Sequence, residues 1–97
     1  MSKVHVTIVA TVNPEGKEQL AHYIEKVGDL YKKVQAKSVN KFKVSKPLIG
    51  TYTPTIVSIM EFPDMNALHD VFESAAYQEL IPYRDKAFSK LEAYISE

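Results

Sequence analysis

The chain has 97 residues and a mass of 11.0 kDa, enough for one domain with a real core and no more, so we expect a single domain over residues 1–97. Twelve basic residues balance twelve acidic ones and cysteine is absent, which argues against a nucleic-acid binder and excludes disulfides, thiolate metal sites and cysteine nucleophiles. No apolar run would span a bilayer, and the first residues lack the continuous apolar region of a signal peptide, so a cytoplasmic protein without a membrane partner is expected.

Residues 3–12 predict a β-strand, because their side chains alternate with a period of two. One face carries Val4, Val6 and Ile8, and the opposite face carries mostly threonine and valine with a single histidine, His5. Since both faces are largely apolar, we expect this strand to be covered on both sides.

Residues 14–36 predict one long amphipathic helix. Asn13 is expected to cap it, and Pro14 suits the first helical position. Apolar side chains recur at spacings of three and four residues on one face: Leu20, Tyr23, Ile24, Val27, Leu30, Tyr31 and Val34. Gly28 inside this helix costs roughly 1 kcal/mol relative to alanine. It indicates either a closely approaching neighbour or a tolerated flaw.

Two further strands follow. Residues 38–46 alternate weakly, as an edge strand does, and Pro47 ends the pattern. Residues 50–54 form a turn-rich connection, and residues 55–62 are the most strand-like segment of the chain.

Short helices and a last strand complete the pattern. Asp64 is expected to cap a second helix with an apolar stripe, and Ser74 to open a third, short one that Pro82 ends or kinks. Alternation returns from Lys86 onward and predicts the last strand.

The predicted order is therefore β-α-β-β-α-β, an α+β ferredoxin-like arrangement with a four-stranded antiparallel sheet. Helices would cover one sheet face and leave the other bare. Because the first and third strands carry valine and isoleucine on both sides, we expect a second copy of the chain to cover that face. The predicted assembly is a homodimer whose two sheets form a barrel.

A motif in the second half of the chain resembles the family called domain of unknown function 1330. It consists of an apolar strand ending in Glu61-Phe62-Pro63, then Ser74, Tyr77-Gln78 and Arg84 at the spacing typical of that family. Two features depart from the family pattern. Val71 occupies the place of an aromatic residue, and the usual Arg-Gly-Gly is replaced by the region of Lys41 and Lys43.

The resemblance places the chain in the wider dimeric α+β barrel group. That group includes cofactor-free antibiotic-biosynthesis monooxygenases, muconolactone-type isomerases, haem-degrading oxygenases and proteins with no known activity. A small-molecule pocket is therefore implied by analogy of fold.

Three residues are candidates for chemistry. Arg84, the only arginine, would clamp a carboxylate, or else pair with acidic neighbours at a helix end. Tyr77 would donate to a substrate oxygen, or else serve as a core residue with its hydroxyl at the rim. His69 would act as an acid or base, or else lie at the flank of a half-polar helix.

Three functions remain open from the sequence. The one favoured is binding of a small aromatic or carboxylate-bearing molecule between helices and sheet, in a pocket lined by Phe62, Leu68, Phe72, Tyr77 and Arg84. The others are a cofactor-free monooxygenase or isomerase, and a structural dimer without chemistry. No cofactor and no metal is expected, because the chain has neither a Gly-rich phosphate loop nor two histidines at helical i, i+4 spacing.

Overall fold

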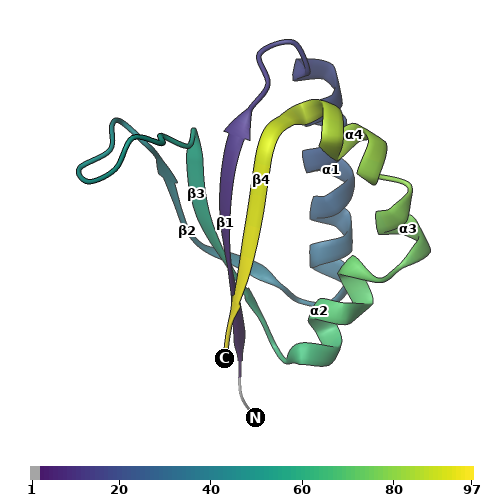
Figure 1. Cartoon of the computed structure of the whole chain (residues 1–97). Coiled ribbons are helices and arrows are strands. Elements are labelled where there is room, and N and C mark those ends of the chain that lie inside the picture. Colours follow the sequence, from purple (N-terminus) through teal and green to yellow (C-terminus); the bar gives the residue numbers. More distant parts are fainter. Residues whose placement is uncertain (1–2) are drawn as a thin grey trace.

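The computed structural model of the chain describes residues 3–97 and contains a four-stranded antiparallel sheet (Figure 1). The strands are β1 (Val4–Val12), β2 (Lys37–Lys43), β3 (Ile56–Phe62) and β4 (Phe88–Ser96). Their order across the sheet is β2-β3-β1-β4, so the first and third strands in sequence occupy the centre. The fold is ferredoxin-like, as predicted, and β2 and β4 are its edges.

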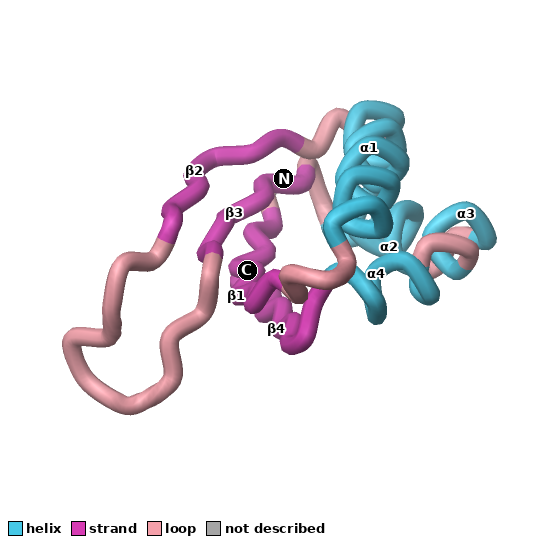
Figure 2. The backbone as a smooth tube through the Cα atoms, turned by 90° about the horizontal axis from the view of Figure 1, so that it is seen from above, coloured by secondary structure: helices cyan, strands magenta, loops and turns pink. Residues whose placement is uncertain are grey.

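One face of the sheet is covered by helices. Seen from above in Figure 2, all of them lie on the same side. They are α1 (Lys17–Lys33), α2 (Met65–Phe72), α3 (Ala75–Gln78) and α4 (Ile81–Ala87). Three short helices thus replace the single second helix of the simplest ferredoxin-like pattern. No helix in residues 3–97 combines the length and the hydrophobicity needed to cross a bilayer.

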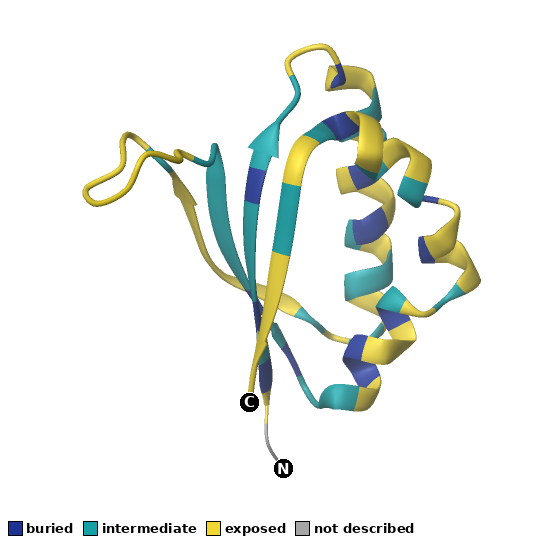
Figure 3. Ribbon diagram, viewed as in Figure 1, coloured by how far each residue is buried: buried dark blue, intermediate teal, exposed yellow. Residues whose placement is uncertain are grey.

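The core lies between the helices and the covered sheet face (Figure 3). Phe62 at the end of β3 and Val71 on α2 are its most completely buried large side chains, at 0% and 1% exposed. Around them pack buried residues from both layers: Val4, Val6, Tyr23, Val27, Met60, Leu68, Tyr77 and Leu80. The strand alternation that predicted β1 therefore sorts its side chains as expected, since Val4 and Val6 face the helices.

The other sheet face has no helix over it. Register identifies its side chains, because residues directly opposite on neighbouring strands point to the same face. Val9 on β1 lies opposite Val57 on β3 and Glu92 on β4, while Phe42 on β2 lies opposite Val57. We call this surface the open sheet face.

The loop of residues 44–55 rises beside the open sheet face, on the side away from the helices (Figure 2). Tyr52 anchors it: its hydroxyl bonds the Thr11 hydroxyl, and the Lys90 ammonium lies 4.3 Å from the centre of its ring. At the loop tip, Leu48 and Ile49 are 97% and 91% exposed.

The start of α1 differs from the prediction. Asn13 does not cap the helix; instead its Oδ1 accepts from the Glu15 N–H at 3.1 Å, and its Nδ2 donates to the Lys86 carbonyl at 3.0 Å. The asparagine closes a turn and ties it to the end of α4, so the helix begins only at Lys17. The helix also ends earlier than predicted, at Lys33, before Gln35 with its φ of 63°.

Pro82 also differs from the prediction, since it neither ends nor kinks α3. That helix stops at Gln78, and Pro82 lies in the first turn of α4. Proline is favoured there because the first N–H groups of a helix have no partner within the helix. The predicted last strand accordingly begins at Phe88 rather than at Lys86.

Gly28, inside α1, and Gly16, just before it, have opposite surroundings. A Cβ built on Gly28 would meet nothing within 4 Å, so no neighbour requires this glycine. A Cβ on Gly16, just before the helix, would lie 2.2 Å from the carbonyl oxygen of Lys86. The close approach of backbones occurs at the β1–α1 turn.

Candidate functional site

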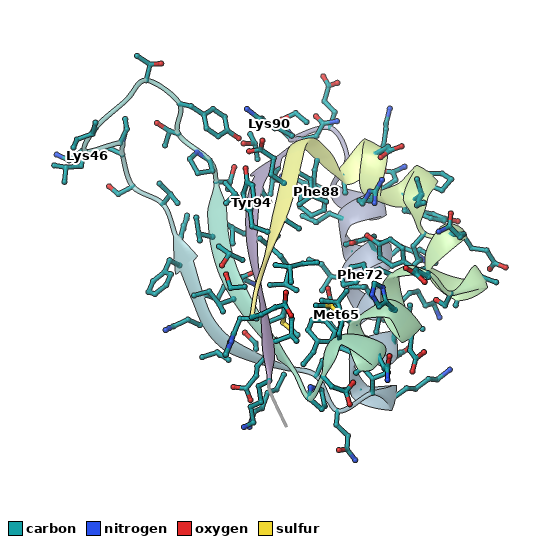
Figure 4. All side chains as sticks on the ribbon, turned by 60° about the horizontal axis from the view of Figure 1, so that its bottom comes forward. Lys46, Met65, Phe72, Phe88, Lys90 and Tyr94 are labelled. Carbon is teal, nitrogen blue, oxygen red and sulfur yellow. The ribbon has the colours of Figure 1, made fainter. Side chains whose placement is uncertain are left out.

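A partly enclosed cavity of about 180 Å³ lies between the sheet and α1. Its apolar wall is formed by ten residues from both layers: Ile8, Ala10, Val12, Leu20, Ile24, Ile56, Phe72, Phe88, Leu91 and Ala93. Figure 4 shows Phe72 and Phe88 on the side of the sheet that faces the helices. For scale, a dry apolar cavity of about 150 Å³ in another protein takes up benzene. This space therefore suits a molecule of about one substituted ring.

The polar residues around this cavity are five: Tyr23 and Tyr31 on α1, Tyr77 on α3, Lys41 on β2 and Ser58 on β3. Lys41 and Ser58 lie opposite each other in the sheet. All five carry hydrogen-bond donors, and none is a carboxylate. The cavity is therefore an apolar space whose polar groups are suited to hold an oxygen acceptor.

Two tyrosines and an arginine form a hydrogen-bonded chain at one end of the cavity. The hydroxyls of Tyr23 and Tyr77 are 2.8 Å apart, and both residues are buried, at 8% and 4% exposed. The Arg84 guanidinium donates through Nη1 to the Tyr77 hydroxyl at 3.3 Å, and its Cζ lies 5.9 Å from the centre of the Tyr77 ring. Arg84 also lies 3.5 Å from Asp85.

Burial, hydrogen bonding and nearby charge together set the protonation of the two α1 tyrosines and Arg84. Burial, and then the neighbouring Tyr77, raises the pKa of Tyr23 well above its ordinary value. Burial likewise raises the pKa of Tyr31. Burial alone would lower the pKa of Arg84, but the bond to Tyr77 and the charge of Asp85 outweigh it and raise that pKa. Tyr23 and Tyr31 therefore stay neutral donors, and Arg84 stays charged.

The local sequence positions the side chains of this hydrogen-bonded chain. Ser74 caps α3 by accepting from the Tyr77 N–H at 3.0 Å, which fixes Tyr77 in the first turn of that helix. The following helix begins near Pro82 and carries Arg84 back toward the Tyr77 hydroxyl. Ser74, Tyr77 and Arg84, which the family motif singles out, thus form one connected unit.

The other candidate residues lie elsewhere. Phe62 packs in the core against Tyr31 and Phe72 and lines none of the cavities described here. Leu68 and His69 line a separate depression beside Ile95, where the His69 Nδ1 is 2.8 Å from the Glu73 carboxylate. The structure therefore brings Tyr77 and Arg84 together, and gives His69 a different partner.

Arg84 is not among the residues that line the main cavity. It lines a second hollow on the β4 side, together with Asp85, Ser89 and Lys90. Five of the described residues border both spaces: Phe72, Tyr77, Phe88, Leu91 and Ala93. Of the five predicted lining residues, Phe72 and Tyr77 are the two that border the main cavity.

Sequence reasoning missed Tyr23, Tyr31 and Ser58 as site residues, and named Lys41 only as a departure from the family pattern. A signal for the tyrosines was present. Tyr23 and Tyr31 are eight residues apart on the apolar stripe of α1, so their hydroxyls recur on the face that packs on the sheet. No comparable signal marks Ser58 or Lys41, because their place depends on strand register.

A charged cluster lies at the other end of β3, around the Glu61 carboxylate. Lys3, His5 and Lys37 lie 3.1, 3.5 and 3.8 Å from its oxygens. The hydrogen bond from Lys3 and the nearby positive charges lower the pKa of Glu61. His5 therefore lies beside the Glu61 carboxylate, away from the cavity. Within residues 3–97, no three histidine or acidic side chains are grouped closely enough to hold a metal ion.

Solved structures share this fold. A protein of unknown function from Rhodopseudomonas palustris superposes with a TM-score of 0.88 at 20% identity, covering 97% of this chain and 80% of its own. A dimeric ferredoxin-like protein of unknown function from Bacteroides fragilis gives a TM-score of 0.62 at 11% identity, covering 98% and 95%. SnoaB, a cofactor-independent oxygenase from Streptomyces nogalater, gives 0.63 at 7% identity, covering 100% and 93%.

At these identities the structural neighbours establish the fold alone. No curated protein is similar enough in sequence to count as a relative. The sequence does match one family model, Domain of unknown function (DUF1330), over residues 6–96. That match extends the motif of Glu61-Phe62-Pro63, Ser74, Tyr77-Gln78 and Arg84 to nearly the whole chain and confirms the resemblance. The chain therefore belongs to the DUF1330 family.

Proposed function

We propose that this protein binds a small, largely apolar molecule, bearing an aromatic ring or a carboxylate, in the cavity between the sheet and α1. The observation that carries the proposal is the cavity itself: about 180 Å³, apolar on most of its wall, with five donor-bearing side chains. Ligand sites usually combine a mostly apolar lining with a few convergent polar groups. A filled interior would instead have favoured a purely structural dimer.

The test is a binding titration with benzoate, phenylacetate and acetophenone, followed by ¹H–¹⁵N chemical shifts of the protein. We expect shifts at residues that line the cavity. Ala93→Phe should weaken binding by at least about tenfold, because it places a ring in the space and binding depends on a preformed site. Ala76→Phe, on the exposed side of α3, is the matched control. Absence of binding by all three probes would contradict the proposal.

An enzymatic role is less well supported. In a cofactor-free monooxygenase or isomerase, His69, Tyr77 and Arg84 would have to steer protons and hold an oxyanion together. His69 pairs with Glu73 in a separate depression, while Tyr77 and Arg84 bond to each other. A binding role needs only the cavity and its donors, and it is therefore the function favoured here.

We further propose a homodimer that buries the open sheet face. Tyr94 lies opposite Thr7, two residues from Val9, and therefore belongs to that face. Phe42 and Tyr94 are 52% and 53% exposed, and the loop tip beside the face exposes Leu48 and Ile49 almost completely. Strands of this length and spacing give a face of roughly 500 Å², and stable interfaces bury about 800 Å² per partner, so sheet and loop together approach that size. The dimeric Bacteroides fragilis neighbour supports this proposal.

Lysine on the open sheet face should dissociate the dimer. We expect the double variant Phe42→Lys/Tyr94→Lys to elute and scatter light as a monomer, where the unmodified chain has twice the 11.0 kDa mass. Both side chains are half-exposed in the protomer, so its fold should tolerate the change. Tyr83→Lys, on the helical side, is the control and should stay dimeric. An unmodified chain that is monomeric at all concentrations would refute the dimer.

A further inference from the structure

The Tyr23–Tyr77–Arg84 chain has more donors than acceptors. The Arg84 N–H can only donate, and it donates to the Tyr77 oxygen. The two phenols add one O–H proton each, and the single contact between their oxygens uses one of these protons. One phenolic proton is therefore left without an acceptor among the residues that the structure describes.

In both possible arrangements the unused proton belongs to a tyrosine that lines the cavity. If Tyr77 donates to Tyr23, the Tyr23 proton is the unused one; if Tyr23 donates to Tyr77, the Tyr77 proton is. Both side chains line the cavity and are more than nine-tenths buried, so bulk water is a poor partner for either proton. A buried donor without an acceptor is costly, and a ligand oxygen would remove that cost.

Charge selects the kind of oxygen. Among residues 3–97, the one cation that lines the cavity, Lys41, comes from β2 on the sheet side, whereas the tyrosine pair belongs to the helices. Arg84, which is bonded to Tyr77, lines the adjoining hollow and lies beside Asp85. An ionised carboxylate is expensive to bury without a direct partner. A neutral carbonyl oxygen needs only one donor, and the Arg84 charge strengthens that donor through Tyr77.

From this hydrogen-bond inventory we infer that the cavity selects a neutral carbonyl compound, with its C=O oxygen bonded to the Tyr23–Tyr77 pair and its apolar part in the space between α1 and the sheet. The inference rests on the proposed binding function and names the ligand class for the same site. It also reassigns Arg84: the arginine polarises Tyr77 and does not itself clamp the ligand.

The experiment compares two ligands of nearly equal shape, acetophenone and cumene. Acetophenone carries a carbonyl where cumene carries a CH–CH₃ group. Dissociation constants of both are measured for the unmodified protein and for the variants Tyr23→Phe, Tyr77→Phe and the double variant. Tyr83→Phe, a half-exposed tyrosine outside the cavity, is the control.

The Tyr23–Tyr77 pair predicts that acetophenone affinity depends on the two tyrosines jointly and not on either one alone. Each single variant keeps one unused phenolic proton, so acetophenone affinity should fall by less than about threefold. The double variant has none, so affinity should fall by about five- to tenfold, the value of one neutral hydrogen bond. Cumene affinity should change less than about twofold in every variant, because it accepts no hydrogen bond.

Two results would overturn the inference, and they are distinguishable. If the double variant weakens the binding of acetophenone and cumene equally, or weakens neither, the cavity binds ligands without a hydrogen bond to the carbonyl. The proposed binding function then stands. If neither compound binds the unmodified protein while the fold is intact by ¹H–¹⁵N spectra, the proposed function fails together with the inference.

Discussion

Replacing Phe62 with alanine should lower the free energy of unfolding by about 3–5 kcal/mol, the largest stability loss that we expect from a single substitution. The Phe62 side chain is completely buried at the end of β3. Its ring lies 5.9 Å from that of Tyr31 and 6.1 Å from that of Phe72. The substitution removes apolar burial and both aromatic contacts, and it leaves a cavity between two layers that cannot fully collapse. The whole free energy of unfolding of a domain of this size is only about 5–15 kcal/mol.

Urea unfolding followed by circular dichroism measures this effect. Phe62→Leu gives a graded comparison and should cost less than Phe62→Ala, because it keeps much of the volume. It also provides a measurement if Phe62→Ala fails to fold. Ile24→Ala, at a half-exposed position of α1, is the control and should change stability by less than about 1 kcal/mol. A Phe62→Ala protein as stable as the unmodified chain would show that this end of the core is not packed as described.

Gly16→Ala should destabilise the protein by about 1–3 kcal/mol, the usual cost of forcing extra atoms into a filled space. The new Cβ would lie 2.2 Å from the Lys86 carbonyl oxygen and 3.2 Å from the Cα of Ala87. Both are backbone atoms, so no flexible side chain can move aside. The β1–α1 turn would have to separate from α4, breaking the 2.9 Å bond from the Asn13 N–H to the Ala87 carbonyl. The backbone of Gly16 has φ −114°, so steric contact is the cause and not backbone strain.

Gly28→Ala is the matched control, for which we expect a stability change of the opposite sign. A Cβ at Gly28 meets nothing, so alanine should stabilise α1 by up to about 1 kcal/mol through helix propensity. Thermal unfolding of the three proteins checks both changes, since 1 kcal/mol corresponds to roughly 4–8 °C at this size. If both glycine variants shift the melting temperature in the same direction, the close approach at the β1–α1 turn is wrong.

The fold was largely predictable because its signals are local. Alternating apolar side chains in β1, the isoleucine- and valine-rich run of β3, and the three- and four-residue spacing along α1 identify each element from neighbours in sequence. The first error arose where a local signal serves a distant contact. Asn13 resembles a helix cap, but its side chain bonds the Lys86 carbonyl, 73 residues away. The second error concerns a helix end: Pro82 resembles a helix breaker, but it lies in the first turn of α4, because α3 has already ended at Gln78.

The candidate site was predictable only in part for the same reason. Tyr77 and Arg84 are seven residues apart, and the structure joins them at 3.3 Å. The partner of Tyr77 on the other side, Tyr23, is 54 residues away, and no spacing rule predicts their contact. Ser58 and Lys41 enter the cavity wall through the pairing of β2 with β3, whose register shifts between Ser38 and Asn40. A one-residue slip there would turn Lys41 to the other face.

The division of the second helical segment into α2, α3 and α4 also affects how the molecule opens. These helices have eight, four and seven residues. Isolated helices shorter than about 12 residues do not persist in water, because too few hydrogen bonds form to offset the cost of nucleation. These three helices therefore persist only while they are packed on the sheet, whereas β1 is hydrogen-bonded to strands on both sides. Partial unfolding should begin in α2, α3 and α4 and leave the sheet intact. It would give a molecule a route to Phe72 and Tyr77 in the cavity lining.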